Sequence, residues 1–199
     1  MIAVDVQQQT AEWFAEKCGV PSASNFSKII QSNGKPSKQR QKYLYQLAGE
    51  CISGIREESY QNASMIRGIE MEDEARKLYE LVTEETVEQV GICYFDEKKL
   101  LSCSADGLIG ADGGLEIKCP IMSTHVGYLL NGGLPSEYFQ QIQGSLYITG
   151  RKWWAFMSYY PSIKPLIINI ERDEKFISAL DSELRTFSKE LEDIINIIR

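Results

Sequence analysis

The segment SCSADGLIGADGGLEIKCP, residues 102–120, contains two short β-rich stretches separated by glycine turns. Asp106 follows the first stretch, and ten residues later the second stretch carries Glu116 and Lys118. Side chains two residues apart on a strand point to the same side, so Glu116 and Lys118 share a face. Asp106, at the end of the neighbouring strand, can approach Glu116 there. The segment therefore predicts a cluster of two acids and one lysine on a β-sheet.

This cluster is what a Mg²⁺-dependent phosphodiester hydrolase needs. Carboxylate oxygens hold a hard cation, the cation lowers the pKa of a bound water, and an ammonium orients that water or offsets developing charge. A surface salt bridge on a hairpin is the alternative interpretation. The other face of the second stretch is apolar throughout (Leu115, Ile117 and Cys119), which indicates a buried strand, where an acid and a lysine without a role are costly.

The chain of 199 residues, 43% of them hydrophobic, fits one domain, and we expect residues 1–199 to form a single domain of the α+β class. Hydrophobic periodicity predicts helices that open at Ser22 and span Ser37–Ser53, Asn62–Val82, Pro135–Thr149 and the last 27 residues. Short β-rich runs predict strands within Val87–Phe95, Leu100–Cys103, Leu115–Cys119, Trp153–Tyr160 and Leu166–Glu171. We expect these strands to form a central mixed β-sheet flanked by helices, with the strands from Val87 to Cys119 running as a hairpin-like meander.

Composition excludes several kinds of site. The five cysteines form no CxxC pair, which argues against a zinc ribbon, and we expect free thiols in a reducing compartment. The single histidine, His125, excludes HExxH zinc sites. No apolar run approaches the length of a membrane span, so we expect a cytoplasmic protein with no membrane partner. A hydrolase of this composition would depend on carboxylates and hard metals.

The net charge of −7 and the pI near 4.9 argue, taken alone, against binding nucleic acid by overall attraction. A small basic channel on an acidic body would still bind it, as would carboxylates whose charge is offset by bound metal. The one strong basic run lies between residues 28 and 42, in a stretch without an acid. A solvated helix face explains this run about as well.

Four motifs occur in a recognisable order, namely Gly68-x-x-x-Glu72, Asp106, Glu116-x-Lys118 and Gln143-x-x-x-Tyr147. This order resembles the PD-(D/E)xK nuclease superfamily and, more narrowly, the phage-λ-type (YqaJ-like) alkaline exonucleases. The stretches SCSADGL, GLEIKCP, YFQQIQGSLYITG and IERDEKF are particularly similar. The resemblance covers nearly the whole chain and implies a restriction-endonuclease-like core.

Such enzymes are Mg²⁺-dependent 5′→3′ double-strand DNA exonucleases. The resemblance implies two-metal hydrolysis, with Mn²⁺ as a possible substitute, acting on double-stranded DNA ends. The product is a 3′ single-stranded tail for a single-strand annealing protein in phage-type homologous recombination. Family members form ring-shaped homotrimers. The chain would then be a phage or prophage protein in a bacterial host.

The resemblance also implies roles for individual residues. It implies that metals are coordinated by three carboxylates and one backbone carbonyl, those of Glu72, Asp106, Glu116 and Ile117. Lys118 would position the attacking water, and Gln143 would support the site from its helix. Lys17, Ser24 and Ser104 fall where the family has a pocket for the 5′-phosphate. Met65 falls where it has an apolar wedge that separates the end base pairs.

The chain departs from the family pattern at three positions. Ala105 precedes Asp106 where the name-giving motif has proline. Lys17 replaces an arginine, and a lysine binds phosphate as a point charge without the bidentate fork. The second arginine of the phosphate pocket has no clear counterpart, and Lys35 is the candidate for its place.

Two other functions remain open from the sequence. An endonuclease of the same superfamily would cut covalently closed circles, which an exonuclease spares. A non-catalytic DNA-end-binding module would keep the fold and lose the chemistry. The intact set of Asp106, Glu116 and Lys118 argues against that module.

Overall fold

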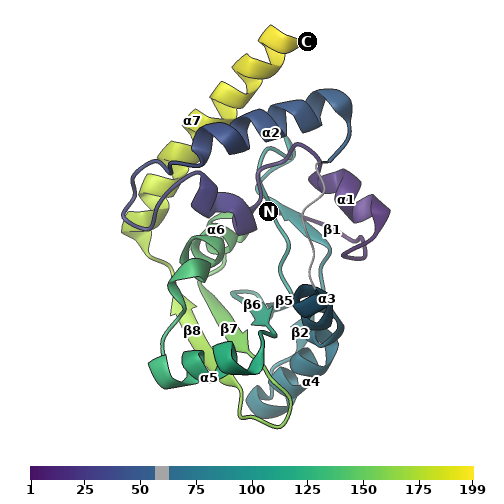
Figure 1. The fold of residues 1–199 in the computed structure, drawn as a ribbon, viewed down its shortest axis with the longest axis vertical. Helices are drawn as coiled ribbons and strands as arrows, with labels where there is room; N and C mark the ends of the chain where they lie inside the picture. Colours follow the sequence, from purple (N-terminus) through teal and green to yellow (C-terminus); the bar gives the residue numbers. More distant parts are fainter. Residues whose placement is uncertain (57–62) are drawn as a thin grey trace.

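The computed structural model describes residues 1–56 and 63–199, so the predicted helix start at Asn62 lies outside the described residues. A five-stranded sheet is built from β2 (Val87–Glu88), β5 (Gly107–Ile109), β6 (Gly113–Lys118), β7 (Trp153–Ser158) and β8 (Leu166–Glu171). Its strand order is β2-β5-β6-β7-β8, and β6 pairs parallel with β7 while the other neighbours are antiparallel (Figure 1). The predicted α+β fold with a central mixed sheet is therefore confirmed.

A second, antiparallel sheet is made of β1 (Ile2–Val4), β3 (Ile92–Tyr94) and β4 (Ser102–Cys103). The prediction of one meander from Val87 to Cys119 was wrong, because β3 and β4 belong to this second sheet, in which β3 pairs with the N-terminal strand β1 and β4 pairs with β3. Strand β5 was also missed. Gly107 suggested a turn, whereas here the residue lies in a strand, where a Cβ would collide with the Val87 side chain.

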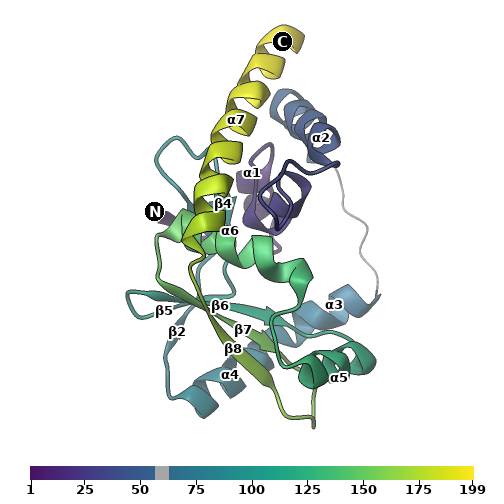
Figure 2. The same cartoon turned by 90° about the vertical axis from the view of Figure 1, so that its left-hand side faces the viewer.

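The helices are α1 (Ala11–Lys17), α2 (Arg40–Ser53), α3 (Ala63–Glu70), α4 (Glu72–Thr83), α5 (Met122–Asn131), α6 (Phe139–Thr149) and α7 (Glu174–Ile198). Two 3₁₀ helices, η1 (Ala23–Lys28) and η2 (Ser136–Tyr138), complete the list. Figure 2 shows α6 crossing one side of the main sheet and α4 lying on the other, with α2 and α7 stacked beyond α6. Among the described helices, none has the length and apolar character needed to cross a membrane.

The predicted long helix ending at Val82 is two helices. The chain breaks at Met71, whose N–H bonds to the carbonyls of both Arg67 and Gly68. Because of this break, Glu72 becomes the first residue of α4 and not a residue in the middle of a helix. Helix α2 ends as predicted at Gly54, which adopts the left-handed φ of +66° that favours glycine at a helix C-terminus.

Alternation along β6 sorts its side chains between the two faces of the sheet. Leu115 and Ile117 pack with Ala75 and Tyr79 of α4 in one apolar cluster. The residues between them therefore face the opposite side, toward α6. This places Glu116, which is only 1% exposed, on the α6 side of a central strand.

The predicted amphipathic C-terminal helix is confirmed as α7. Its apolar stripe is buried at Ile177, Leu180, Leu184, Phe187 and Leu191. The helix packs along α2, and its N-terminus is capped by the Asp173 carboxylate, which accepts a hydrogen bond from the N–H of Phe176 at 2.9 Å. The stripe is thus core over most of its length, while its end at Ile198 is exposed.

Close packing between α6 and η1 depends on Gly144. A Cβ at this position would lie 2.5 Å from a ring carbon of Phe26. We expect Gly144→Ala to lower the free energy of unfolding by about 1–3 kcal/mol, as overpacking does. The matched control is Gly49→Ala in α2, where a Cβ meets nothing within 4 Å and should stabilise by about 0.5–1 kcal/mol. Thermal unfolding of both variants measures the difference, and equal melting temperatures would refute the tight contact.

Candidate active site

A cavity of about 710 Å³ opens on the α6 side of β6, bounded by α1, α3 and the start of α4. Of the residues predicted from the sequence, the structure brings most to its walls: Lys17, Ser24, Met65, Glu72, Ser104, Asp106, Glu116, Ile117 and Lys118. Gln143 and Lys35 do not line it.

Glu116 lies at the floor of the cavity and is held from two sides. The Lys118 ammonium forms an ion pair with its Oε1, as two residues on one face of a strand can. The side-chain amide of Gln141, on α6, donates a hydrogen bond to the same oxygen at 2.5 Å. The other oxygen, Oε2, is buried without a hydrogen-bond partner among the described residues. One carboxylate oxygen is thus satisfied and the other is left for a ligand.

Asp106 is fixed by the backbone of the neighbouring strand. Its N–H bonds to the Leu115 carbonyl at 3.1 Å, and its Oδ2 accepts a hydrogen bond from the Ile117 N–H at 2.6 Å. From the other side of the sheet, Arg76 of α4 donates to the Asp106 carbonyl at 3.4 Å. These contacts hold the Asp106 carboxylate beside β6, as the sequence spacing predicted.

The acids in the cavity influence one another's protonation. Burial, and then the charge of Glu116, raise the pKa of Asp106 well above its usual range. Burial likewise raises the pKa of Glu72. The positive charge of Lys118 opposes this rise, and the negative charge of Glu116 adds to it. Burial disfavours the Lys118 ammonium, but the charges of Glu116 and Asp106 outweigh it and raise the pKa of Lys118 above its ordinary value. The lysine is therefore protonated at neutral pH.

The donor set fits a hard divalent cation. Three carboxylates face one cavity, and the buried Oε2 of Glu116 has no donor in the described part of the chain. Oxygen ligands of this kind are those that Mg²⁺ and Mn²⁺ take in proteins. As they stand, no three Asp, Glu, His or Cys side chains of residues 1–56 and 63–199 converge into a ready ligand cluster. Lys118, paired with Glu116, balances part of the negative charge of the carboxylates.

The expected support of the site by Gln143 is not what the structure shows. Its amide nitrogen donates to the Glu171 carbonyl at 2.9 Å, and its Oε1 accepts from the Asp173 N–H at 2.9 Å. Gln143 therefore faces the corner between β8 and α7. Residues two apart on an α-helix differ by about 200° in direction, so Gln141 faces the cavity when Gln143 faces away. Both glutamines are present in the sequence, and only the rotation of α6 about its axis decides which of them faces the cavity.

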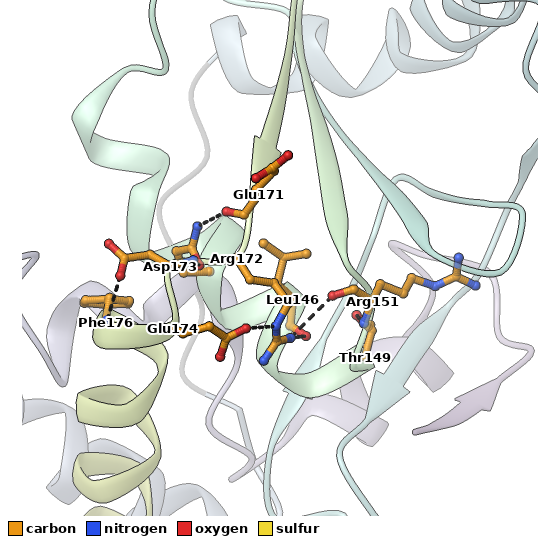
Figure 3. Close-up of polar contacts among 9 residues, drawn as sticks. Leu146, Thr149, Arg151, Glu171, Arg172, Asp173, Glu174 and Phe176 are labelled. Atoms are coloured by element: carbon orange, nitrogen blue, oxygen red, sulfur yellow. Dashed lines mark hydrogen bonds and ion pairs between the residues drawn. The ribbon is translucent and has the colours of Figure 1, made fainter.

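Figure 3 shows the corner between β8 and α7, which the stretch IERDEKF forms. Arg172 donates to the carbonyls of Leu146 at 2.8 Å and Arg151 at 3.4 Å, and pairs with Glu174 at 2.7 Å. It thereby ties the C-terminal end of α6 to the segment between β8 and α7, adding to the hydrogen bond that the Leu146 carbonyl accepts from the Gly150 N–H at 3.0 Å. The stretch IERDEKF therefore supports α6, the helix that carries Gln141.

A second group of polar residues lines the cavity beside the acids. The Lys17 ammonium lies 3.5 Å from the Ser104 hydroxyl and 4.0 Å from the centre of the Trp13 ring. Ser24 lines the same cavity, and its hydroxyl lies 3.3 Å from that of Ser22. Burial, together with a nearby arginine, lowers the pKa of Lys17 to about 8. These residues form a small cationic pocket next to the acidic one.

Lys35 lies elsewhere. It is exposed in the turn after η1, where its N–H bonds to the Asn33 side chain at 3.0 Å. Two other cations line the cavity, Lys28 and Arg56, and the Arg56 guanidinium lies 4.9 Å from the centre of the Phe14 ring. No spacing or motif pointed to Arg56, because it follows α2 in an irregular stretch.

Met65, on α3, stands at the cavity and is 47% exposed. Ile69, one turn later, lines the same wall. His125, in contrast, is buried away from the cavity between the Ser158 hydroxyl at 2.8 Å and the Lys164 carbonyl at 3.1 Å. The single histidine is therefore a core residue whose two ring nitrogens both have hydrogen-bond partners.

Comparison with known proteins agrees with this geometry. The family model of the YqaJ-like viral recombinase domain matches residues 12–152. Two crystal structures of LHK-Exo, an alkaline exonuclease from Laribacter hongkongensis, one of them in complex with dAMP, match with TM-scores of 0.86 and 34% identity. Each match covers 95% of this chain and 96% of that one.

A phage-related exonuclease from Haemophilus somnus 129PT matches with a TM-score of 0.72 at 15% identity, over 90% of this chain and 96% of that one, and shows the shared fold. No curated protein sequence matched. The family model spans more than half of the chain, and the match to LHK-Exo nearly all of it. The chain belongs to the YqaJ-like viral recombinase family.

Proposed function

We propose that this chain is a metal-dependent DNA exonuclease that digests one strand of a duplex from its 5′ end. The observation that carries the proposal is one cavity that holds both the Asp106, Glu116 and Lys118 cluster and the cationic pocket around Lys17. The first group suits phosphodiester hydrolysis and the second suits a terminal phosphate. Family membership and the similarity to an alkaline exonuclease support the same conclusion.

Glu72, Asp106 and Glu116, with the Ile117 carbonyl, would hold the Mg²⁺ ions, with Mn²⁺ as a substitute. When bound, such ions neutralise charge on the scissile phosphate and lower the pKa of nearby water. The contribution of the protein is to hold the carboxylates that would bind the metal ions in fixed orientations. Asp106 is held by the Ile117 N–H, and the Gln141 amide keeps the Glu116 carboxylate in one orientation.

Lys118 is placed to act as a hydrogen-bond donor. The charges of Glu116 and Asp106 raise its pKa above the ordinary value, which favours the ammonium form. Held by Glu116 and lying 5.5 Å from the centre of the Tyr138 ring, its ammonium can orient the water and offset the charge that develops on the phosphate. Attack on phosphorus with loss of the 3′ oxygen releases a nucleoside 5′-monophosphate, the class of molecule bound in the dAMP complex of LHK-Exo.

The DNA end would be bound by the other half of the cavity. Lys17, Ser24 and Ser104 would bind the 5′-phosphate, and the exposed Met65 would press against the terminal base pairs as an apolar wedge. We further propose that residues 1–199 act as one exonuclease domain, assemble as a homotrimer and supply 3′ tails to a single-strand annealing protein in phage-type recombination. Light-scattering mass in solution tests the trimer directly.

The main test uses linear duplex DNA with 5′-phosphates, labelled separately at each end and incubated with Mg²⁺. A closed circular duplex and the Asp106→Asn protein serve as controls. Early release of the 5′ label, an intact circle and an inactive variant are expected. A cut circle would favour an endonuclease, and no cleavage with Mg²⁺ or Mn²⁺ would favour a DNA-end-binding module.

Lys17→Ala is expected to reduce the preference for 5′-phosphorylated ends over 5′-hydroxyl ends by about 10-fold or more. A hydrogen bond to a charged group contributes about 1.5–3 kcal/mol, which corresponds to this range. The ratio of initial rates on the two substrates measures the preference, with the exposed Lys175→Ala as the control. An unchanged ratio would refute the role of Lys17.

A further inference from the structure

Tyr138 stands beside Lys118 at the wall of the cavity. The Lys118 ammonium lies over the Tyr138 ring, 5.5 Å from its centre. An ammonium within about 6 Å of an aromatic centre is attracted by the negative charge on the face of the ring. The ring is therefore a second contact of this ammonium, in addition to the carboxylate of Glu116.

The Tyr138 ring is itself held in place by other rings. It stacks on Phe156 with the ring centres 5.2 Å apart and the planes 30° apart. Phe156 is fully buried, and it is the β7 partner of Glu116 in the register of β6 and β7. The Tyr128 ring meets Tyr138 edge to face at 6.4 Å. Because the backbone N–H of Tyr138 also bonds to the Pro135 carbonyl at 3.0 Å, the ring offers Lys118 a fixed surface.

Lys118 needs such a surface because its other contact is shared. Within residues 1–56 and 63–199, its ammonium forms one ion pair, with the Oε1 of Glu116. The same carboxylate is a proposed metal ligand, and a cation bound there would compete with Lys118 for its negative charge. A lysine side chain has a flexible four-carbon stem, so a weakened ion pair leaves it free to turn away. The face of an aromatic ring attracts the ammonium and offers no carboxylate oxygen to the metal, so this contact remains.

We propose that Tyr138 is a positioning residue, whose ring holds the Lys118 ammonium in place while a strand is cleaved. This inference rests on the proposed function, since it takes Lys118 to act on the attacking water and the scissile phosphate. The competing role for a half-buried tyrosine in this cavity is to stack on a base of the DNA. Stacking would act on the binding of DNA, whereas positioning of Lys118 acts on the rate of cleavage once DNA is bound.

The first test measures single-turnover cleavage of a duplex with Mg²⁺, and the Kd of the duplex in EDTA. Tyr138→Leu removes the aromatic face and should lower the cleavage rate constant about 10-fold with an unchanged Kd. Tyr138→Phe keeps the face and should retain the wild-type rate constant. Tyr45→Leu, at an exposed tyrosine outside the cavity, is the matched control. A higher Kd with an unchanged rate constant would overturn the proposal, and so would equal losses of rate in Tyr138→Leu and Tyr138→Phe.

A second measurement needs neither metal nor cleavage. Melting temperatures in EDTA are compared for Tyr138→Leu, Lys118→Gln and the double variant. If the ring holds the ammonium, Tyr138→Leu should cost about 2–4 °C less in the Lys118→Gln protein than in wild-type protein. Additive losses would overturn the role of Tyr138, whether or not the enzyme cleaves DNA. Wild-type protein that cleaves no duplex would instead refute the proposed function, and this inference with it.

Discussion

Replacing Lys118 with alanine is expected to lower the rate of strand cleavage by about 10³-fold while duplex binding changes little. Loss of one preorganised donor that acts on developing charge typically costs about 10²–10³ in kcat. Lys118 also holds the Glu116 carboxylate, so its loss disturbs one proposed metal ligand as well. The DNA end is bound by other residues of the cavity, which the substitution leaves in place.

Cleavage is followed in single turnover with Mg²⁺, and binding by fluorescence anisotropy in EDTA. Because Glu116 is buried, the alanine variant leaves its carboxylate with the Gln141 hydrogen bond and no ion pair, and Lys118→Gln is included to preserve a second hydrogen-bond donor. Both variants should be inactive if the positive charge matters. Lys152→Ala, which removes an exposed lysine paired with Asp112 at the far end of the sheet, should retain full activity. Equal loss of binding and cleavage would rule out the assigned role.

Asp106→Asn is expected to abolish activity and yet to raise the melting temperature of the metal-free protein. Burial and the charge of Glu116 make ionised Asp106 unfavourable, as its raised pKa indicates. An acid with a raised pKa in the folded state destabilises the fold as pH rises above its unfolded value, so the neutral amide removes a cost at pH 7. The amide oxygen can still accept from the Ile117 N–H.

The measurement is thermal unfolding with EDTA and with Mg²⁺. For a chain of this length, each 1 kcal/mol shifts the melting temperature by about 2–4 °C. Wild-type protein should gain stability from Mg²⁺ by mass action, and Asp106→Asn should lose that gain. The Asp112→Asn variant, in which an exposed acid is replaced, should keep the stability gained from Mg²⁺. A lower melting temperature in EDTA, or an unchanged response to Mg²⁺, would contradict the expectation.

Local patterns predicted much of the site. Alternation along β6 placed Glu116 and Lys118 on one face, and the spacing placed Asp106 beside them. Gly54 marked the end of α2, and the apolar stripe of α7 marked its buried face. In each case both the sequence pattern and the local structure that it predicts depend on residues that lie a few positions apart in the chain.

What the sequence did not provide depends on tertiary packing. Only the rotation of α6 against the sheet decides that Gln141, and not Gln143, reaches Glu116. The break at Met71 has no proline or glycine at the break itself to announce it. Arg56 enters the cavity through a contact with Phe14, more than forty residues away in the chain. No local pattern encodes such contacts.

The parallel pairing of β6 with β7 also fixes when the enzyme can become active during its synthesis. On one side β6 pairs with β5 immediately before it, but on the other its partner begins only at Trp153, after α5 and α6. Parallel strands require such a long crossover, and its closure waits until the crossover has been made. A nascent chain that has not left the ribosome beyond β7 therefore lacks the strand that pairs with β6 and completes the sheet around Glu116. Incomplete products of translation are consequently expected to carry no nuclease activity.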